Sequence, residues 1–210
     1  MKSKKIIFVT YFVTLILLFT VFTILTLSDV LAKLDLMAYS NLSQLNADIL
    51  FKVITEFGNV WIIMLITLIF IICTRKKEVI ITIAVCLIGI LILNNVLKIC
   101  IGRTRPEGIA LVEETGYSYP SSHSAVSTSF YLTLAAYLNG IKINKKWKIL
   151  SILLAPMIII SIATSRIYLG IHYATDVIAG IMVGTIYFLL SYYLVNNYIM
   201  PKVNKLRISK

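Results

Sequence analysis

Residues 79–97 read VIITIAVCLIGILILNNVL, a stretch without a charged side chain. A helix needs about 20 predominantly apolar residues to cross the hydrocarbon core of a bilayer. This stretch therefore predicts a membrane-spanning helix. A second uncharged run, IIFVTYFVTLILLFTVFTILTL, occupies residues 6–27. It exceeds the roughly 7–15 residues of a signal-peptide core, so we expect it to be retained as a span.

The same hydropathy pattern recurs along the whole chain. We expect spans at residues 6–27, 58–74, 79–97, 122–140, 149–165 and 173–197. Hydrophobic residues make up 59% of the 210 residues, and the mean hydropathy is +0.92, a composition that excludes an ordinary soluble domain. Little sequence remains outside the spans. The prediction is a single all-α domain over residues 1–210, a bundle of six transmembrane helices.

The longest connection between the expected spans, residues 28–57, mixes apolar and polar positions. Leu31 and Leu34 alternate with acidic residues such as Asp29 and Asp35. Such a mixture favours a helix that lies on the outer membrane surface over a further span. An ordinary loop is the alternative.

The Lys and Arg residues divide unequally between the two sides of the expected bundle. One side carries Lys2, Lys4, Lys5, Arg75, Lys76, Lys77, Lys142, Lys145, Lys146, Lys148, Lys202, Lys205, Arg207 and Lys210. The other side carries Lys33, Lys52, Lys98, Arg103, Arg105 and Arg166. The positive-inside rule places the richer side, with both termini, in the cytoplasm of a multi-pass cell-membrane protein. Because the charges are spread over several loops, we expect contact with lipid headgroups and none with nucleic acid.

Three polar clusters interrupt the apolar runs on the side predicted to face outward. They are Lys98 with Arg105-Pro106, then Pro120-Ser121-Ser122-His123, then Ser165-Arg166 with His172 and Asp176. Charged residues at a membrane are costly, so they indicate a functional site. Cations, hydroxyls, imidazoles and a carboxylate are groups that can bind and cleave a phosphate ester.

The first two clusters supply groups that bind anions. Ser121 and Ser122 precede an expected helix, whose N-terminal N–H groups attract phosphate, although many such serines only cap a helix. His123 favours a catalytic role, because burying an imidazole costs desolvation energy. Lys98 and Arg105, with Arg103 as a further candidate, supply positive charge, and a guanidinium can bind two phosphate oxygens at once.

The third cluster places a histidine and an aspartate four residues apart, on one face of a helix. Asp176 can accept a hydrogen bond from Nδ1 of His172, which leaves Nε2 free to act as a nucleophile. A pair that only caps the helix is the alternative. His123, His172 and Asp176 could offer three ligands to zinc. The surrounding cations oppose a divalent ion, so we expect no metal and no cofactor.

Together these residues resemble the signature of the type-2 phosphatidic acid phosphatase superfamily. That signature is Lys, six residues and Arg-Pro; then Pro-Ser-Gly-His; then Ser-Arg, five residues, His, three residues and Asp. Lys98 with Arg105-Pro106 matches its first part, and Ser165-Arg166 with His172 and Asp176 matches its third. In the second part Ser122 replaces the usual glycine. A serine still offers its backbone N–H to phosphate where φ is negative.

The resemblance implies a metal-independent integral membrane lipid phosphatase with assigned residue roles. His172 would attack phosphorus to form a phosphohistidine, and Asp176 would orient it. His123 would protonate the leaving oxygen and then activate the water that releases phosphate. The phosphoryl oxygens would be held by Lys98, Arg105, Ser121, Ser122, Arg166 and Ser165.

The small size and single domain resemble phosphatidylglycerophosphatase B-like members of this superfamily. The resemblance implies a lipid phosphomonoester or diphosphate substrate in the bilayer, with undecaprenyl diphosphate and phosphatidylglycerophosphate as the leading candidates. An outward-facing site favours the polyprenyl diphosphate, which is released on that face. One alternative is a phosphotransferase that passes the phosphoryl group to another acceptor. The other is a catalytically silent protein that binds anionic lipid, which Ser122 alone favours.

Overall fold

The computed structural model describes residues 2–74, 77–201 and 203, and the described chain contains helices and no β-strand. The helices are α1 (Lys2–Leu27), α2 (Ala32–Ser43), α3 (Asp48–Glu56), α4 (Val60–Thr74), α5 (Lys77–Ile101), α6 (Ser122–Gly140), α7 (Lys145–Tyr168), α8 (Ala174–Leu194) and the π-helix η1 (Val195–Ile199). The prediction of an all-helical chain is confirmed.

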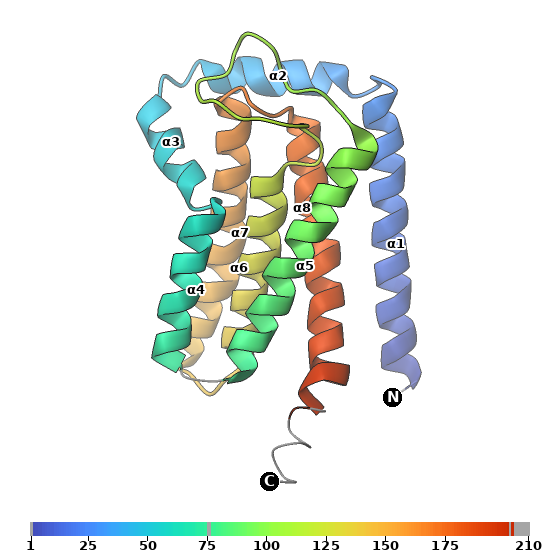
Figure 1. Cartoon of the computed structure of the whole chain (residues 1–210), viewed down its shortest axis with the longest axis vertical. Coiled ribbons are helices and arrows are strands. Elements are labelled where there is room, and N and C mark those ends of the chain that lie inside the picture. The colour runs from blue at the N-terminus through green and yellow to red at the C-terminus, as the bar shows by residue number, and fades with distance from the viewer. Residues whose placement is uncertain (1, 75–76, 202, 204–210) are drawn as a thin grey trace.

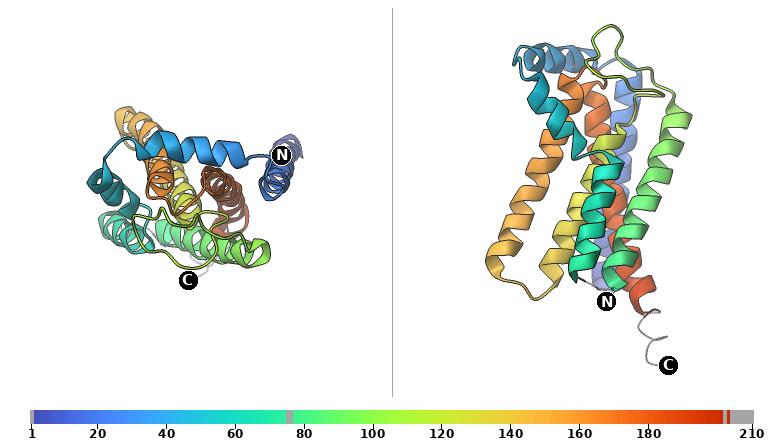
Figure 2. Two further views of the ribbon diagram at one scale, coloured as in Figure 1. Left: turned by 90° about the horizontal axis from the view of Figure 1, so that it is seen from above. Right: turned by 60° about the vertical axis from the view of Figure 1, so that its left-hand side comes forward.

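Helices α1 and α4 to α8 run along the long axis of the molecule, whereas α2 lies across one end (Figure 1). Seen from above, α2 extends from α1 over the ends of the other helices (Figure 2). Each expected span overlaps one of the long helices, and the last expected span continues into η1. The connection 28–57 is largely helical, because it contains both α2 and α3.

Four of the described helices are long and apolar enough to cross a membrane. They are Lys5–Leu27, Glu78–Ile101, Lys145–Tyr168 and Ala174–Ile199. Helices α3 and α4 together form a fifth candidate, bent by 52° at the break between them. Helix α6 coincides with an expected span, residues 122–140, but it is not apolar enough to be one of these candidates.

The polar composition of α6 follows from its place in the bundle. Ser124, Ser127 and Ser129 on this helix are fully buried. Helix α6 packs against α8, α7 and α5, so protein rather than lipid surrounds much of its surface. A helix enclosed in this way can keep polar side chains that a lipid-facing helix could not.

Two glycines on α8 allow it to approach α6 closely. A Cβ atom on Gly180 would lie 2.6 Å from the carbonyl oxygen of Ser121, and one on Gly184 would lie 2.5 Å from that of Ala125. At the end of the bundle covered by α2, the N–H of Ser121 donates to the carbonyl oxygen of Asp176 at 3.0 Å. This close packing joins the N-terminal ends of α6 and α8.

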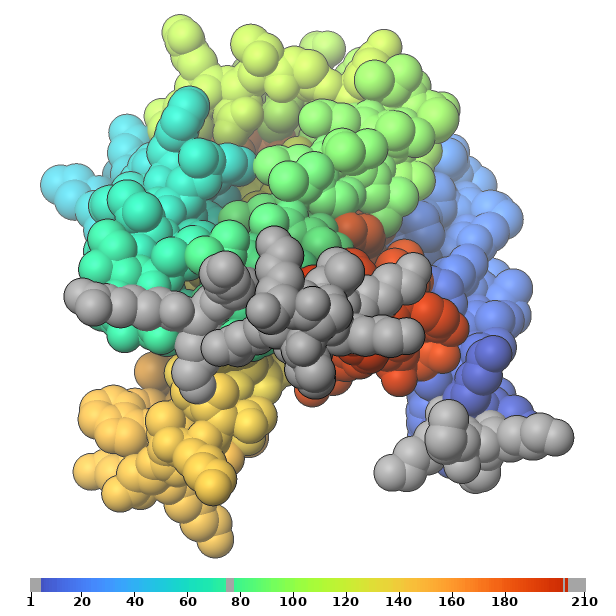
Figure 3. Space-filling model, turned by 60° about the horizontal axis from the view of Figure 1, so that its bottom comes forward, coloured from blue at the N-terminus to red at the C-terminus, as the bar shows by residue number. Residues whose placement is uncertain are grey.

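The opposite end of the molecule carries the basic turn between α6 and α7, which protrudes there (Figure 3). Lys142, Lys145 and Lys146 in and beside this turn are exposed. Of the other basic residues expected on this side, Arg75, Lys76, Lys202, Lys205, Arg207 and Lys210 lie outside the described residues.

Candidate active site

The polar clusters of the sequence lie at helix ends near α2. Lys98 is in the last turn of α5, and Arg166 is in the last turn of α7. Ser121 is the N-cap of α6, and Asp176 is in the first turn of α8. The long loop between α5 and α6 passes over these ends (Figure 1).

His172 is buried and held from two sides. Its Nδ1 lies 3.4 Å from Oδ2 of Asp176, and its Nε2 lies 3.3 Å from Nη1 of Arg105. A carboxylate beside Nδ1 favours the tautomer that carries its proton on Nδ1, so the lone pair of Nε2 points toward the cationic side. Arg105 is fixed in turn by the carbonyl oxygens of Ile171, Gly116 and Thr115, each at 3.0 Å.

The surroundings of His172 keep its imidazole neutral. Burial lowers the pKa of His172 well below its usual 6.5, and the positive charges of Arg166, Arg105 and Lys98 lower it further. A neutral imidazole is the nucleophilic form, because protonation removes the lone pair of Nε2.

A second cluster surrounds Glu114, which lies in the loop between α5 and α6. Its carboxylate pairs with Arg166, lies 3.6 Å from Nη2 of Arg105 and lies 4.0 Å from Nδ1 of His123. Burial raises the pKa of Glu114, but the charge and hydrogen bond of Arg166, together with the charges of its other neighbours, outweigh this effect, so the pKa falls below its usual 4.5. Glu114 is therefore ionised at neutral pH.

Arg166 can donate a further hydrogen bond to an anion. Its Nη1 donates to Oγ1 of Thr55 on α3 at 2.9 Å, and its Nη2 donates to Glu114. Within the described part of the chain, its buried Nε has no hydrogen-bond partner. A buried donor without a partner is costly, which indicates a site for an acceptor.

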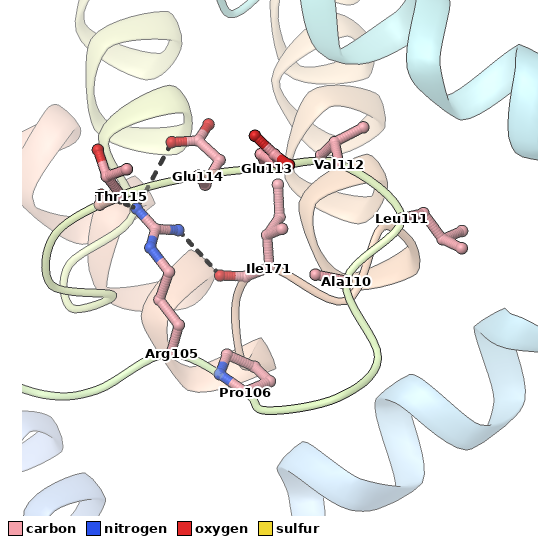
Figure 4. A pocket seen from close by; sticks show the side chains of 9 residues that line it. All are labelled: Arg105, Pro106, Ala110, Leu111, Val112, Glu113, Glu114, Thr115 and Ile171. Carbon is pink, nitrogen blue, oxygen red and sulfur yellow. Dashed lines mark hydrogen bonds and ion pairs between the residues drawn. The ribbon is translucent and has the colours of Figure 1, made fainter.

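A cavity of about 520 Å³ adjoins this cluster (Figure 4). Arg105 and Glu114 line it together with the loop around Leu111 and with Ile171. Figure 4 shows Arg105 between the carboxylate of Glu114 and the carbonyl oxygen of Ile171. The cavity therefore gives the guanidinium of Arg105 an accessible side.

The remaining cation and one serine of the predicted site have backbone or side-chain partners. The Nζ of Lys98 donates to the carbonyl oxygens of Tyr117 and Ser118. Oγ of Ser122 accepts a hydrogen bond from Asn94 at 2.9 Å. Among the described residues only Asp29 and Asn46 combine a side chain with positive φ, so Ser122 meets the condition for offering its N–H.

The hydroxyls of the other two serines have hydrogen-bond partners other than the cations. The buried hydroxyl of Ser121 accepts from Ser124 at 3.2 Å. The hydroxyl of Ser165 donates to the carbonyl oxygen of Ile162, in its own helix, at 2.6 Å. Among the described residues, neither hydroxyl forms a hydrogen bond with a charged side chain.

Three residues of the site were missed by reasoning from the sequence: Asp35, Thr55 and Glu114. Each comes from a segment outside the signature and contacts a signature residue or its neighbour. Asp35 is one of several acidic residues between positions 28 and 57, and nothing in the sequence distinguished it from the exposed Asp29 and Asp48. Nothing in the sequence distinguished Glu114 from other loop acids.

Arg103 takes a place different from that of the other cations. Its Nη1 donates to Oδ1 of Asp176 at 2.6 Å, and its Nη2 donates to Oδ2 of Asp35 at 2.9 Å. Its guanidinium carbon lies 4.2 Å from the ring centroid of Tyr173. Arg103 thus binds two carboxylates rather than facing the cavity of Figure 4.

Two curated relatives match parts of the chain. It is 37% identical to phosphatidylglycerophosphatase B of Bacillus subtilis over 100 residues, which cover 47% of this chain and 49% of that protein. It is 28% identical to an undecaprenyl-diphosphatase of Sulfolobus acidocaldarius over 157 residues, which cover 71% of this chain and 70% of that one. The first match thus spans about half the length of the relative.

Solved structures share the fold. A transmembrane PAP2 type phosphatidylglycerolphosphate phosphatase from Bacillus subtilis superposes with a TM-score of 0.81 and 24% identity, over 89% of this chain and 96% of that one. Aquifex aeolicus LpxE superposes with a TM-score of 0.61 and 22% identity, over 76% of this chain and 95% of that one. The PAP2 superfamily model matches residues 78–200, more than half of the sequence. The resemblance read from the polar clusters is confirmed, and the chain belongs to the PAP2 superfamily.

Proposed function

We propose that this protein is a membrane lipid phosphatase that hydrolyses a lipid phosphomonoester or diphosphate through a phosphohistidine at His172. One observation carries the proposal: His172 lies between Asp176 at Nδ1 and Arg105 at Nε2. A phosphoryl group bound by Arg105 would lie beside the lone pair of Nε2. Membership of the PAP2 superfamily supports the same chemistry.

In the first half of the reaction, Nε2 of His172 attacks phosphorus and the P–O bond to the lipid or lipid phosphate breaks. Asp176 accepts the hydrogen bond of Nδ1–H and stabilises the positive charge that grows on the ring. His123 donates a proton to the leaving oxygen. In the second half, His123 takes a proton from water, the water oxygen attacks phosphorus and the N–P bond breaks. These steps need no metal ion.

The phosphoryl oxygens replace Glu114 among the cations. In this structure Arg166 pairs with the Glu114 carboxylate, and Nη2 of Arg105 lies 3.6 Å from it. Phosphate carries more charge than a carboxylate and can accept from several donors, including the buried Nε of Arg166. We infer that the substrate displaces Glu114, whose carboxylate then moves toward His123.

Six helices, α1 and α4 to α8, cross the membrane in this proposal, with both termini in the cytoplasm. The site and α2 then lie at the outer surface, as does the α3 end of the bent pair. The exposed lysines of the α6–α7 turn, at the end remote from the site, support this orientation. The enclosure of α6 by its neighbours explains how a Ser-rich helix can cross.

The substrate is undecaprenyl diphosphate or phosphatidylglycerophosphate in our proposal. The names of the two curated relatives support these two candidates. A site on the outer leaflet favours the diphosphate. Both substrates present a terminal phosphate that the Arg105 and Arg166 pair can bind.

Phosphate release from a panel of purified lipid phosphates tests the proposal. The panel includes both candidates, phosphatidic acid and a water-soluble phosphomonoester, and each is assayed with and without EDTA. We expect release from at least one lipid, unchanged by EDTA. Radiolabelled phosphate that appears on a second lipid or sugar instead of as the free anion would indicate a phosphotransferase.

The control variant is His172→Ala. Removing the nucleophile should lower kcat by at least about a thousandfold, while the melting temperature of the purified protein stays close to that of the wild type. Turnover retained by this variant would overturn the assignment of the nucleophile. An inactive wild type that still binds lipid phosphates would favour the silent lipid-binding alternative.

A further inference from the structure

We propose that Asp35, on helix α2, is a positioning residue for the nucleophile, acting through Arg103 on Asp176. The inference rests on the proposed role of His172. The family model begins at residue 78, so membership assigns no role to α2 or to Asp35. The contacts that carry the inference join four residues in the order Asp35, Arg103, Asp176 and His172.

The first link is between α2 and the loop that follows α5. The Asp35 side chain is only 5% exposed, and its Oδ2 accepts from Nη2 of Arg103 at 2.9 Å. The same carboxylate binds the start of α8. Its Oδ1 accepts from the N–H of Thr175 at 2.8 Å, and its Oδ2 accepts from the Thr175 hydroxyl at 2.9 Å. Asp35 thus has a partner for each oxygen.

The second link fixes the carboxylate of Asp176. Arg103 binds Oδ1 of Asp176 at 2.6 Å. Oδ2 accepts from the N–H of Tyr173 at 2.9 Å and faces Nδ1 of His172 at 3.4 Å. Because the two oxygens have different partners, rotation of the carboxylate would break contacts on both sides. Arg103, which binds Oδ1, therefore also fixes the position of Oδ2, the oxygen that faces His172.

The third step is electrostatic. Arg103 lies between two carboxylates, so its positive charge is shared by Asp35 and Asp176. Without the charge of Asp35, the whole positive charge of Arg103 would act on the carboxylate of Asp176. This carboxylate would then be a weaker hydrogen-bond acceptor for Nδ1–H of His172. The imidazole gains positive charge as Nε2 attacks, so a weaker acceptor raises the barrier of the chemical step. Binding of phosphate by Arg105 and the other cations should change little.

A purely structural role for Asp35 is the competing explanation, because its carboxylate also caps α8 through Thr175. The substitution Asp35→Asn separates the two roles. An asparagine oxygen can still accept from the N–H of Thr175, whereas the negative charge beside Arg103 is lost. A matched control is Asp48→Asn, an acid-to-amide change at the start of α3, where Asp48 accepts from Tyr168 and does not contact this chain of four residues.

The experiment measures kcat and KM for the best lipid phosphate in detergent or vesicles, together with melting temperatures. For Asp35→Asn we expect kcat to fall about tenfold, the scale on which partners behind a functional side chain act, with KM within about twofold. Asp48→Asn should keep the kcat of the wild type. Arg103→Lys, which keeps one charge but cannot donate to both carboxylates with a planar fork, should also lower kcat without raising KM. Adding Asp35→Asn to Arg103→Lys should lower kcat by less than about twofold more, because both changes break one pathway.

Several results would overturn the inference. They are an unchanged kcat for a folded Asp35→Asn variant, an equal loss for Asp48→Asn, or full additivity in the double variant. If Asp35→Asn cannot be purified folded, Arg103→Lys decides: an unchanged kcat overturns the inference, and a loss confined to kcat supports it. An active wild type with an inactive His172→Ala and an unaffected Asp35→Asn would refute only this inference. A wild type that releases no phosphate would refute the proposed function itself.

Discussion

At the scale of single residues, the neutral imidazole of His172 determines how activity should depend on pH. Burial and the charges of Arg166 and Arg105 lower its pKa well below 6.5. The nucleophile must be unprotonated, so kcat/KM should fall only when the pH drops below this lowered pKa. We expect an acid limb below pH 6.5 in the pH profile of kcat/KM, whereas an unperturbed histidine would titrate near 6.5.

The variant Glu114→Gln supplies the control for this pH profile. The charge of Glu114 raises the pKa of His172. Loss of that charge should therefore move the acid limb to still lower pH. A limb centred at or above 6.5 in the wild type, or one that moves upward in the variant, would contradict the account of the charges around His172.

Glu114 also predicts how tightly the site binds inorganic phosphate. Its carboxylate competes for Arg166 and Arg105 in this structure. A neutral glutamine competes less, so Glu114→Gln should lower the inhibition constant for inorganic phosphate by about tenfold, or about 1.4 kcal/mol. Inhibition of lipid phosphate hydrolysis by added phosphate measures this constant.

A different result for Glu114→Gln would assign another role to this carboxylate. A lower kcat with an unchanged or weaker phosphate inhibition would show that Glu114 does not compete for the phosphate position. Its 4.0 Å approach to Nδ1 of His123 would then be its main contribution. The two outcomes separate competition with phosphate from orientation of the proposed acid.

At the scale of elements, the α6–α8 contact predicts a strong effect of a single methyl group. A Cβ on Gly184 would lie 2.5 Å from the carbonyl oxygen of Ala125 and 2.7 Å from Cβ of Thr128. Gly184→Ala must therefore push the two helices apart, which overpacking data place at about 1–3 kcal/mol. We expect a lower melting temperature and a lower kcat, since Ser121 and Asp176 lie at the joined ends of these helices.

Gly140→Ala is the matched control for this prediction. Gly140 ends α6, and a Cβ there would meet no atom within 4 Å. This variant should keep the melting temperature and kcat of the wild type. Equal effects of the two substitutions would show that backbone propensity, rather than the close α6–α8 packing, determines the loss.

The same contact shows why sequence reasoning reached some elements more easily than others. Helices α1, α5, α7 and α8 have long apolar runs, so they could be expected from hydropathy alone. Helix α6 was expected from its overall apolar character, yet its buried serines make its sequence less hydrophobic than that of those helices. Its polar face is explained by the helices around it, which only the three-dimensional arrangement reveals.

At the scale of the whole molecule, the predicted site residues came from spacing within short motifs. His172 and Asp176 are four residues apart, and the sequence predicted them on one face of a helix. That helix begins only at Ala174, with Tyr173 as its N-cap, so the prediction of a shared helix face is wrong, and the capping turn brings the two side chains together. Asp35 is 140 residues away from Thr175, and Arg166 is 52 residues away from Glu114. No periodicity relates such pairs. Contacts of this kind depend on how α2, α3 and the loop between α5 and α6 fold over the end of the bundle (Figure 1).

The orientation of the whole molecule gives the last prediction. Glu107 lies in the loop before α6, Lys142 lies in the turn after it, and both are exposed. In a variant without Cys73, Cys86 and Cys100, the single substitutions Glu107→Cys and Lys142→Cys therefore report the two ends of one helix. In intact cells a membrane-impermeant maleimide should label Glu107→Cys. It should reach Lys142→Cys only after permeabilisation, because the proposed topology places the basic turn in the cytoplasm. The reverse pattern would turn the site toward the cytoplasm, and labelling of both from one side would show that α6 does not cross the bilayer.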